Sequence, residues 1–237
     1  MSVPVFLAPD LDRNRVVLDG AEGRHAAGAR RLRSGEVVDL VDGRGTRASC
    51  EVTGVGRDTV VLQVLGRALE RVPEPRLVLV QALPKGERGE LAVELATEVG
   101  VDEVVPWVAA RCVMQWKGER GEKALARWRS TAREAAKQSR RAYVPEVAAL
   151  HTTRQLVDRL AGATTLVLHE AATDPLTSAE LPASGTVAIV VGPEGGLTDE
   201  EVQQLGGRAV RLGASVLRTS TAGAAALAVL SARTGRW

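Results

Sequence analysis

The sequence predicts an α/β protein with two domains, a small β-rich domain at residues 1–71 and a larger domain at residues 72–237 with a mainly parallel sheet. Short β-like segments separated by glycine and aspartate turns predict the first domain. Two prolines, Pro73 and Pro75, mark the boundary. After them, strand-like apolar runs alternate with helix-like segments, which is typical of a parallel sheet with crossover helices.

Short β-like segments and turn residues define the first domain. The dipeptide Asp42-Gly43 lies between two of the segments and is typical of a hairpin turn. Residues 25–32 form the one helix-like stretch in this part of the chain. We therefore expect a small β-rich domain with strands at residues 15–18, 36–41, 49–55 and 59–64.

The larger domain shows both strand and helix patterns. Leu91, Leu95 and Val99 recur at helical spacing. Thr198 and Glu201 form a capping box, in which the threonine oxygen accepts from a backbone N–H and the glutamate reaches back. We expect strands at residues 77–80, 103–108, 166–168, 187–191 and 210–212, and helices at residues 87–99, 124–139, 198–205 and 219–232.

Composition places the chain among ordinary globular proteins. Of its 237 residues, 45% are hydrophobic and 25% charged, which is atypical of a disordered or fibrous chain. Four Trp, one Tyr and one Phe leave little for a base-stacking platform of the kind used by RNA recognition motifs. The net charge of +2, taken whole, does not indicate a nucleic-acid binder.

The charge is, however, unevenly distributed along the chain. Residues 111–141 carry ten basic and three acidic side chains, whereas residues 161–210 carry seven acidic and one basic. A basic run can be a solvated helix face or a surface that follows RNA phosphates, and charge alone leaves both interpretations open. A second basic cluster in the first domain strengthens the phosphate interpretation; it consists of Arg24, Arg30, Arg31 and Arg33.

The sequence holds no pattern for a metal, a disulfide framework or a membrane span. Cys50 and Cys112 lie far apart, and the three histidines are scattered, so no zinc-ligand spacing occurs. The N-terminal stretch lacks a basic region followed by a long apolar one, and every apolar run is far shorter than the ~18 residues of a spanning helix. We expect a cytoplasmic protein without metal.

A glycine-rich turn follows the expected strand at residues 187–191. It reads Gly192-Pro193-Glu194-Gly195-Gly196-Leu197 and leads into the capped helix. In open α/β sheets, ligands bind at the carboxyl ends of strands, and glycines there let the backbone approach a ligand. The spacing is neither a dinucleotide nor a P-loop fingerprint, and the acidic helix start would repel phosphate. The turn therefore indicates a ligand without phosphate, or a tight turn with no ligand.

A second strand–loop–helix junction lies at residues 212–222. Thr219 or Ser220 can cap the Ala-rich helix that follows. The guanidinium of Arg218, at the junction, can clamp a carboxylate or a phosphate. Taken alone, a helix cap beside a surface arginine explains the same residues.

Together the two junctions resemble the C-terminal signature segments of the SPOUT class of methyltransferases, and within it the bacterial 16S rRNA (uracil-N3) methyltransferase family. The first turn matches the family's G-P-E-G-G-[LF], and the second junction matches L-G-x-x-[IV]-L-R-x-E-T-A. The resemblance covers nearly the whole chain in order. Further segments that carry it are residues 81–86 with 97–101, Arg111-Cys112, residues 134–139 with 144–146, and His25 with residues 31–33 and 35–36.

The resemblance implies a C-terminal SPOUT domain with a trefoil knot, a PUA-like N-terminal barrel and a homodimer whose active site lies near the subunit boundary. It implies that S-adenosylmethionine donates a methyl group to N3 of a uridine in 16S rRNA of the small ribosomal subunit. The cofactor would be held by Leu168, His169, Glu170, Gly192, Pro193, Glu194, Gly195, Gly196, Leu212, Gly213, Leu217, Thr219, Thr221 and Ala222.

Position in the chain and the distribution of charge give the candidate reacting and RNA-binding residues. Arg218 is the candidate for engaging the target nucleotide and stabilising developing charge. His169 and Glu170 are candidate bases by position, although an ordinary loop histidine is the simpler interpretation. RNA contacts are expected from Arg24, Arg30, Arg31, Arg33, Arg111, Arg133, Arg140 and Arg141.

Two departures from the family pattern and three alternative functions remain. Ser220 and Lys137 stand where the family usually or often has Glu, which puts any role of the glutamate at position 220 in doubt. The alternatives are a SPOUT methyltransferase of another RNA site, a non-catalytic RNA-binding or ribosome-assembly module of the same fold, and an unrelated small-molecule α/β enzyme, for instance one that uses a nucleotide. A non-catalytic module would need a degraded glycine turn, and the turn is intact.

Overall fold

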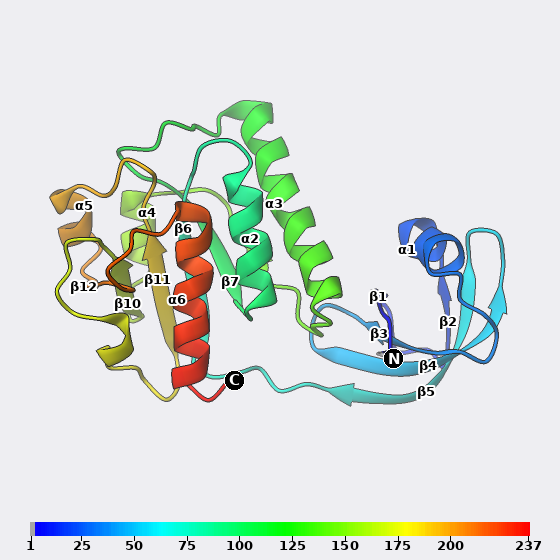
Figure 1. The fold of residues 1–237 in the computed structure, drawn as a ribbon. Helices are drawn as coiled ribbons and strands as arrows, with labels where there is room; N and C mark the ends of the chain where they lie inside the picture. The colour runs from blue at the N-terminus through cyan, green and yellow to red at the C-terminus, as the bar shows by residue number, and fades with distance from the viewer. Residues whose placement is uncertain (1–2) are drawn as a thin grey trace. The chain divides into compact units, whose positions relative to one another are not determined.

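The structure is a computed structural model that describes residues 3–237 and divides the chain into two compact units (Figure 1). The first unit comprises residues 3–72 together with Ala136–Val144, and the second comprises Pro73–Ala135 and Pro145–Trp237. Polar bonds tie the short segment to the first unit: Lys137 pairs with Glu22, and the Tyr143 hydroxyl donates to the Glu70 carbonyl. These contacts link residues far apart in sequence.

The first unit is a five-stranded sheet in the order β1-β3-β4-β5-β2. The β1–β3 pair is parallel, and the other pairs are antiparallel. Register shifts in the β4–β5 pair indicate bulges, which bend a sheet and allow it to curl. The strands are β1 (Val5–Leu7), β2 (Arg15–Leu18), β3 (Val37–Val41), β4 (Thr46–Val55) and β5 (Val60–Leu69).

The helical stretch of the first unit begins earlier than the sequence predicts. Helix α1 spans Gly20–Arg24 and continues as one π-helical turn, η1, at His25–Ala29. Gly23 lets α1 pack closely on its neighbours, because a Cβ there would lie 2.3 Å from the Asp58 carbonyl oxygen. The chain leaves the turn through Arg31, whose φ of 53° is rare for a residue with a side chain.

The second unit contains the parallel sheet that the sequence predicts. Its strand order is β12-β10-β11-β6-β7-β8, with β9 also paired to β7, and each of these pairs is parallel. The strands are β6 (Arg76–Ala82), β7 (Glu103–Val108), β8 (Glu146–Val147), β9 (His151–Thr152), β10 (Thr164–Leu168), β11 (Thr186–Val191) and β12 (Arg208–Val210).

One strand prediction was wrong by two residues. The last strand covers Arg208–Val210 instead of residues 210–212, because Val210 pairs with Leu168 at the end of β10. Arg211 only bridges to Pro175, and Leu212 already belongs to the following loop.

Helices cover both faces of the parallel sheet. Leu77 and Leu79 of β6 pack into a core cluster with residues of α2, α3 and α6, whereas Val78 and Val80 pack with Leu156 of α4 on the opposite face. This alternation follows from the two-residue period of a strand. The helices are α2 (Arg88–Glu98), α3 (Gly118–Gln138), α4 (Thr153–Arg159), α5 (Asp199–Gln204) and α6 (Thr219–Arg233), with a 3₁₀ turn, η2, at Leu176–Ser178.

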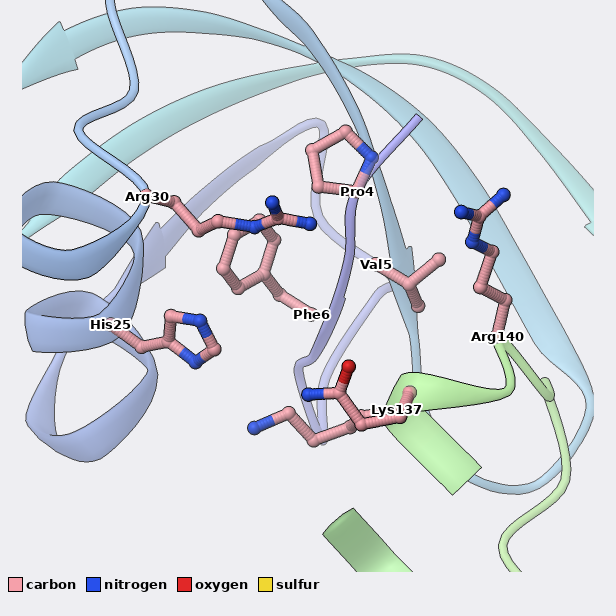
Figure 2. A pocket seen from close by; sticks show the side chains of 8 residues that line it. Pro4, Val5, Phe6, His25, Arg30, Lys137 and Arg140 are labelled. Atoms are coloured by element: carbon pink, nitrogen blue, oxygen red, sulfur yellow. The ribbon is translucent and has the colours of Figure 1, made fainter. Parts of the chain in front are cut away.

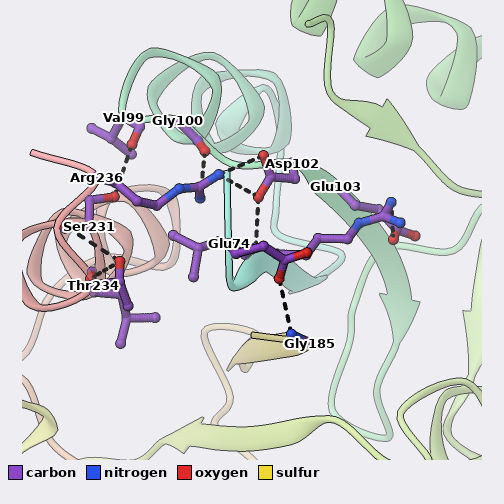
Figure 3. A network of polar contacts seen from close by, with 12 residues as sticks. Glu74, Val99, Gly100, Asp102, Glu103, Gly185, Ser231, Thr234 and Arg236 are labelled. Atoms are coloured by element: carbon purple, nitrogen blue, oxygen red, sulfur yellow. Dashed lines mark hydrogen bonds and ion pairs between the residues drawn. The ribbon is translucent and has the colours of Figure 1, made fainter. Parts of the chain in front are cut away.

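The chain end after α6 is fixed by a polar network (Figure 3). The Arg236 guanidinium donates to both carboxylate oxygens of Asp102 at 2.9 and 2.8 Å and to the Gly100 carbonyl. Asp102 in turn accepts from the backbone N–H of Leu77 at 2.7 Å. The network joins the end of α6 to the start of β6, so it holds α6 against the sheet.

None of the helices in residues 3–237 is long and apolar enough to cross a bilayer. The most apolar of the longer helices, α6, has 15 residues, whereas a span needs about 20. Its apolar character serves the core, since Ala226, Leu227 and Leu230 are fully buried against the sheet.

Candidate active site

The Glu194 carboxylate joins three segments of the second unit at the carboxyl edge of the parallel sheet. Its Oε1 accepts from the backbone N–H of Lys85 at 3.1 Å and from the Arg88 guanidinium at 3.2 Å, after strand β6. It also accepts from the Thr219 hydroxyl at 3.5 Å, at the start of α6. The glycine turn and the second junction, 25 residues apart in sequence, therefore meet at one side chain.

Glu194 is a charged structural link and not a proton acceptor tuned to neutral pH. Burial by itself would raise the pKa of its carboxyl. Hydrogen bonds from its own backbone N–H, from Lys85 and from Arg88 outweigh that effect, so the pKa lies below its ordinary value. The carboxylate stays ionised and keeps its donors in place.

The glycine turn is tightly built. A Cβ at Gly192 would lie 2.9 Å from the Leu197 side chain, and Gly196 has a φ of +71°, so both positions require glycine. The Arg111 guanidinium donates to the carbonyls of Gly195 and Leu197, each at 3.1 Å. These bonds fix the turn before any ligand binds.

The helix after the turn begins with the predicted capping box. The Thr198 hydroxyl accepts from the N–H of Glu201, and the Glu201 carboxylate accepts from the N–H of Thr198, at 3.1 Å each. The other oxygen of Glu201 accepts from Ala110 N–H at 2.6 Å, after β7. The loops after β6, β7 and β11 are thus tied together at one edge.

At the second junction, the predicted cap was wrong. Arg218 occupies the N-cap position of α6, and no side-chain cap bond forms there. Thr219 and Ser220 lie one and two residues inside the helix; the Thr219 hydroxyl donates to Glu194 instead, and Ser220 is buried. The two hydroxyl groups that the local pattern assigned to the helix cap are therefore used in tertiary packing.

The segment before α6 is exposed and carries the candidate catalytic residue. Val216 is 77% exposed and Leu217 is 41% exposed, which is high for apolar side chains. The Arg218 side chain is exposed, and its guanidinium has no hydrogen-bond acceptor among residues 3–237. Its charge is available to a ligand.

The residues predicted at the end of β10 reach the same edge of the sheet, since β10 is the parallel neighbour of β11. Leu168 and His169 are partly buried, and Glu170 is exposed. The Nδ1 atom of His169 accepts from the backbone N–H of Ala171 at 3.2 Å, so this nitrogen stabilises its own loop. The structure supports the loop-histidine interpretation more than the proton-acceptor one.

Gln81 is a residue of this edge that sequence reasoning did not single out as a site residue. It is fully buried near the end of β6, in register with Val191, the residue before the glycine turn. Its Nε2 donates to the Ala82 carbonyl, while its Oε1 has no partner among the described residues. An unpaired buried acceptor costs about 1–3 kcal/mol. In the sequence, a glutamine at the end of an otherwise apolar strand is the signal that could have identified Gln81 as a site residue.

Cys112 lies on the loop after β7, where burial disfavours the thiolate form. Burial raises the pKa of its thiol, and although hydrogen bonds from Ala109 and Leu83 lower it, the charges of Glu201 and Glu194 raise it further. A thiol that stays protonated at neutral pH is a poor nucleophile. Direct attack by cysteine on a substrate ring is therefore disfavoured.

The arginines predicted to bind RNA divide between the two units. Arg24, Arg30, Arg31, Arg33, Arg140 and Arg141 belong to the first unit, and Arg111 and Arg133 belong to the second. Arg30 and Arg140 line one cavity of about 310 Å³ together with His25 and Lys137 (Figure 2). We call it the Arg30 cavity. Arg111, in contrast, holds the glycine turn, as described above.

Lys137, one of the two residues that depart from the family pattern, lines the Arg30 cavity and forms an ion pair. The Lys137 ammonium, with 5% of its side chain exposed, pairs with the Glu22 carboxylate at 2.5 Å. The second oxygen of Glu22 accepts from the N–H of Leu7 on β1. A glutamate at position 137 would face Glu22, so lysine suits this chain.

These features define a class of protein: an open parallel α/β sheet whose carboxyl edge carries a preformed glycine turn, joined to a curled β unit. Family models identify the class. Residues 72–231 match the model described as RNA methyltransferase domain, and residues 18–65 match the model described as RNA methyltransferase PUA domain.

Named relatives and a solved structure agree with the family models. The chain is 48% identical over 229 residues to ribosomal RNA small subunit methyltransferase E of Mycobacterium bovis, covering 93% of this chain and 87% of that one. The Bacillus subtilis protein of the same name is 33% identical, with coverages of 92% and 90%. A Neisseria gonorrhoeae structure of that name, bound to S-adenosyl methionine, superposes with a TM-score of 0.88 at 29% identity and 98% coverage of both chains.

The chain therefore belongs to the family of RNA methyltransferases that includes the ribosomal RNA small subunit methyltransferases E. The predicted family, the α/β fold with a PUA-like unit and the methyltransferase class are confirmed. The individual site residues and the knot stay predictions.

Proposed function

We propose that this protein transfers a methyl group from S-adenosylmethionine to N3 of a uridine in 16S rRNA. The observation that carries the proposal is the junction at Glu194, where the family's two signature segments meet at the carboxyl edge of the parallel sheet. Residues 72–237 act as the catalytic domain, and residues 1–71 help to bind RNA. The protein works in the cytoplasm as a homodimer, as the family resemblance implies.

The residues at the carboxyl edge fit S-adenosylmethionine. The glycines at positions 192, 195 and 196 leave backbone groups open to a ligand, because side chains there are excluded by packing or by φ. The unpaired Oε1 of Gln81 suits a ligand that brings an N–H donor, and the cofactor has amino groups at both ends. The exposed Val216 and Leu217 suit its apolar surface. When bound, the cofactor supplies an activated methyl group on a sulfonium.

Arg218 is the residue of this chain that stabilises charge on the target base during methyl transfer. The N3 proton of uracil is weakly acidic, and its transfer to solvent water leaves negative charge on the imide. A guanidinium without a protein acceptor stabilises that charge as it develops. Positioning of the base against the methyl group supplies much of the rest. The raised pKa of Cys112 supports direct transfer without a covalent enzyme–base bond.

RNA binding is assigned to the basic residues of both units. Several positively charged side chains line the Arg30 cavity, and its size and lining suit a phosphate of the RNA backbone. Arg31 and Arg140 adopt φ of 53° and 57°, a backbone conformation that is rare for residues with a side chain and is often found at functional sites.

The decisive experiment is nucleoside mass mapping of small-subunit rRNA from a strain that lacks this protein. We expect the loss of 3-methyluridine and its return when the wild-type gene is supplied. Loss of a different modification would assign another RNA site. An unchanged pattern, together with absent heat of binding for S-adenosylmethionine, would favour a non-catalytic RNA-binding module.

A further inference from the structure

A second cavity, of about 410 Å³, lies in the second unit beside the glycine turn. It shares Pro84 and Gly86 with the loop whose Lys85 N–H donates to Glu194, so it begins where the candidate active site ends. Its volume falls within the range of about 300–1,000 Å³ that is usual for small-molecule sites. The remaining lining comes from the start of α2 and from residues 114–128, and we call it the Trp116 cavity.

The indole of Trp116 is fixed in the wall of this cavity. Its ring meets the ring of the buried Trp128 at 4.9 Å and nearly at right angles. Gly121 of α3 packs on its backbone, because a Cβ there would lie 2.7 Å from the Trp116 carbonyl carbon. Met114, which is 38% exposed, lines the same wall. The cavity thus offers a rigid aromatic surface that is only partly buried.

Cationic side chains of α3 form the rim of the Trp116 cavity. Arg120, Lys123 and Arg127 recur at helical spacing and line it together. Arg127 pairs with Glu90 at 3.1 Å, and Lys123 meets Glu119 only at 3.8 Å between exposed groups. Arg120 has no acceptor among residues 3–237. The rim therefore retains uncompensated positive charge.

We propose that the Trp116 cavity binds one unstacked nucleotide of the RNA substrate, next to the nucleotide that is methylated. An aromatic face with arginines around it is the arrangement by which proteins hold single-stranded nucleic acid, the base stacking on the ring and the phosphate meeting the cations. The amide of Gln115 adds an NH₂ group that donates and a carbonyl oxygen that accepts for a base edge. The proposal rests on the proposed function for the position of the target nucleotide.

The test compares a single-stranded RNA of about twelve nucleotides with a ribose-phosphate oligomer of the same length without bases, within the site sizes of about 4–16 nucleotides known for such surfaces. Wild-type protein should bind the RNA about ten-fold more tightly in fluorescence anisotropy. Trp116→Ala should bind both oligomers alike, and Trp116→Phe should keep most of the preference. Trp237→Ala, an exposed tryptophan outside the cavity, is the matched control and should behave as wild type.

A separate variant tests the proposed contact between the cationic rim of the Trp116 cavity and the RNA phosphate. Arg120→Ala should weaken binding of both oligomers equally and lower the slope of log K against log salt by about 1. Arg154→Ala, an exposed arginine on α4, should leave the slope unchanged. If Trp116→Ala keeps the preference for bases, or loses affinity for both oligomers equally while its melting temperature is normal, the stacking role is overturned.

The place of the site in catalysis is tested with the rRNA fragment that carries the methylated uridine. Trp116→Ala should raise KM for this RNA about ten-fold and leave kcat near that of the wild type. An unchanged KM would overturn the assignment to a neighbouring nucleotide. Failure of the wild-type protein to methylate any small-subunit rRNA would instead overturn the proposed function, and the oligomer measurements would still decide on the cavity.

Discussion

The Arg30 cavity of the first unit and the Trp116 cavity of the second unit are both basic, yet their aromatic residues differ. In the Arg30 cavity, Phe6 is 1% exposed and its ring meets His25 edge-on at 5.7 Å, so it belongs to the core. In the Trp116 cavity, an indole is only partly buried and lines the wall. The first suits a phosphate alone, and the second suits a base with its phosphate.

The difference teaches that the number of aromatic residues says little about stacking. Six aromatics predicted that the chain lacks a stacking platform. We propose that one half-buried tryptophan with arginines beside it stacks a single base. The following predictions test the division of labour between the cavities and the active site.

The largest effect is expected at the active site, outside both cavities. Arg218→Ala should reduce kcat by about 10²–10³-fold, because it removes a charge that acts in the transition state. The affinity for S-adenosylmethionine, measured by calorimetry, should stay nearly unchanged. Arg154→Ala serves as the control on the same unit. Turnover at the wild-type rate in Arg218→Ala would remove the residue from the chemical step.

The next effect is on the stability of the first unit. Lys137→Ala leaves the partly buried Glu22 carboxylate without its partner and should lower the free energy of unfolding by about 3 kcal/mol. Lys137→Glu should cost at least as much, since two carboxylates then face each other. Denaturant melts measure both, and Glu22→Lys combined with Lys137→Glu should recover part of the loss. Equal stability of all variants would show that the pair adds nothing to the fold.

A smaller effect separates the two cavities directly. Arg30→Ala should lower the slope of log K against log salt for RNA by about 1, because one phosphate contact is lost. Its preference for RNA over the base-free oligomer should remain that of the wild type. If this variant loses the preference for bases, the Arg30 cavity also reads bases, and the comparison fails.

The smallest effect concerns pH. The pKa of Glu194 is lowered by folding, so its ionised form stabilises the protein above the ordinary value of 4.5, and this stability is lost as pH falls through the lower folded pKa. The stability difference between wild type and Glu194→Gln should therefore be constant near neutral pH and shrink below about pH 4.5. Thermal melts across pH 3–7 measure it, and a difference that grows toward acid would contradict the assigned direction.

Local patterns predicted most of the elements well. The strand expected at residues 103–108 is β7, and the capping box at Thr198 and Glu201 is present. Helix α4 was missed although Thr152 and Gln155 form a capping box, because only Leu156 of that helix is fully buried and the apolar pattern is weak. Strand β1 was missed because three residues are too few to show a period.

The site was predictable where it depends on backbone conformation and not where it depends on distant partners. Gly192 and Gly196 are required by close packing and by a positive φ, which a glycine-rich turn indicates locally. The hydroxyl of Thr219 and the guanidinium of Arg111 have partners 25 and 84 residues away. A local pattern therefore assigned the first to a helix cap and the second to RNA.

The sequence by itself determined the α/β class, the basic and acidic regions, the glycine turns and, through its motifs, the family. These follow from periodicity, turn chemistry and local spacing, which act between near neighbours. Only the tertiary structure decided that Glu194 joins the two signature segments and that Lys137 is paired with Glu22. It also decided that Trp116 is only partly buried where it lines its cavity, whereas Phe6 in the wall of the Arg30 cavity is 1% exposed. Burial and pairing depend on which distant segments pack together, and a linear pattern does not specify that.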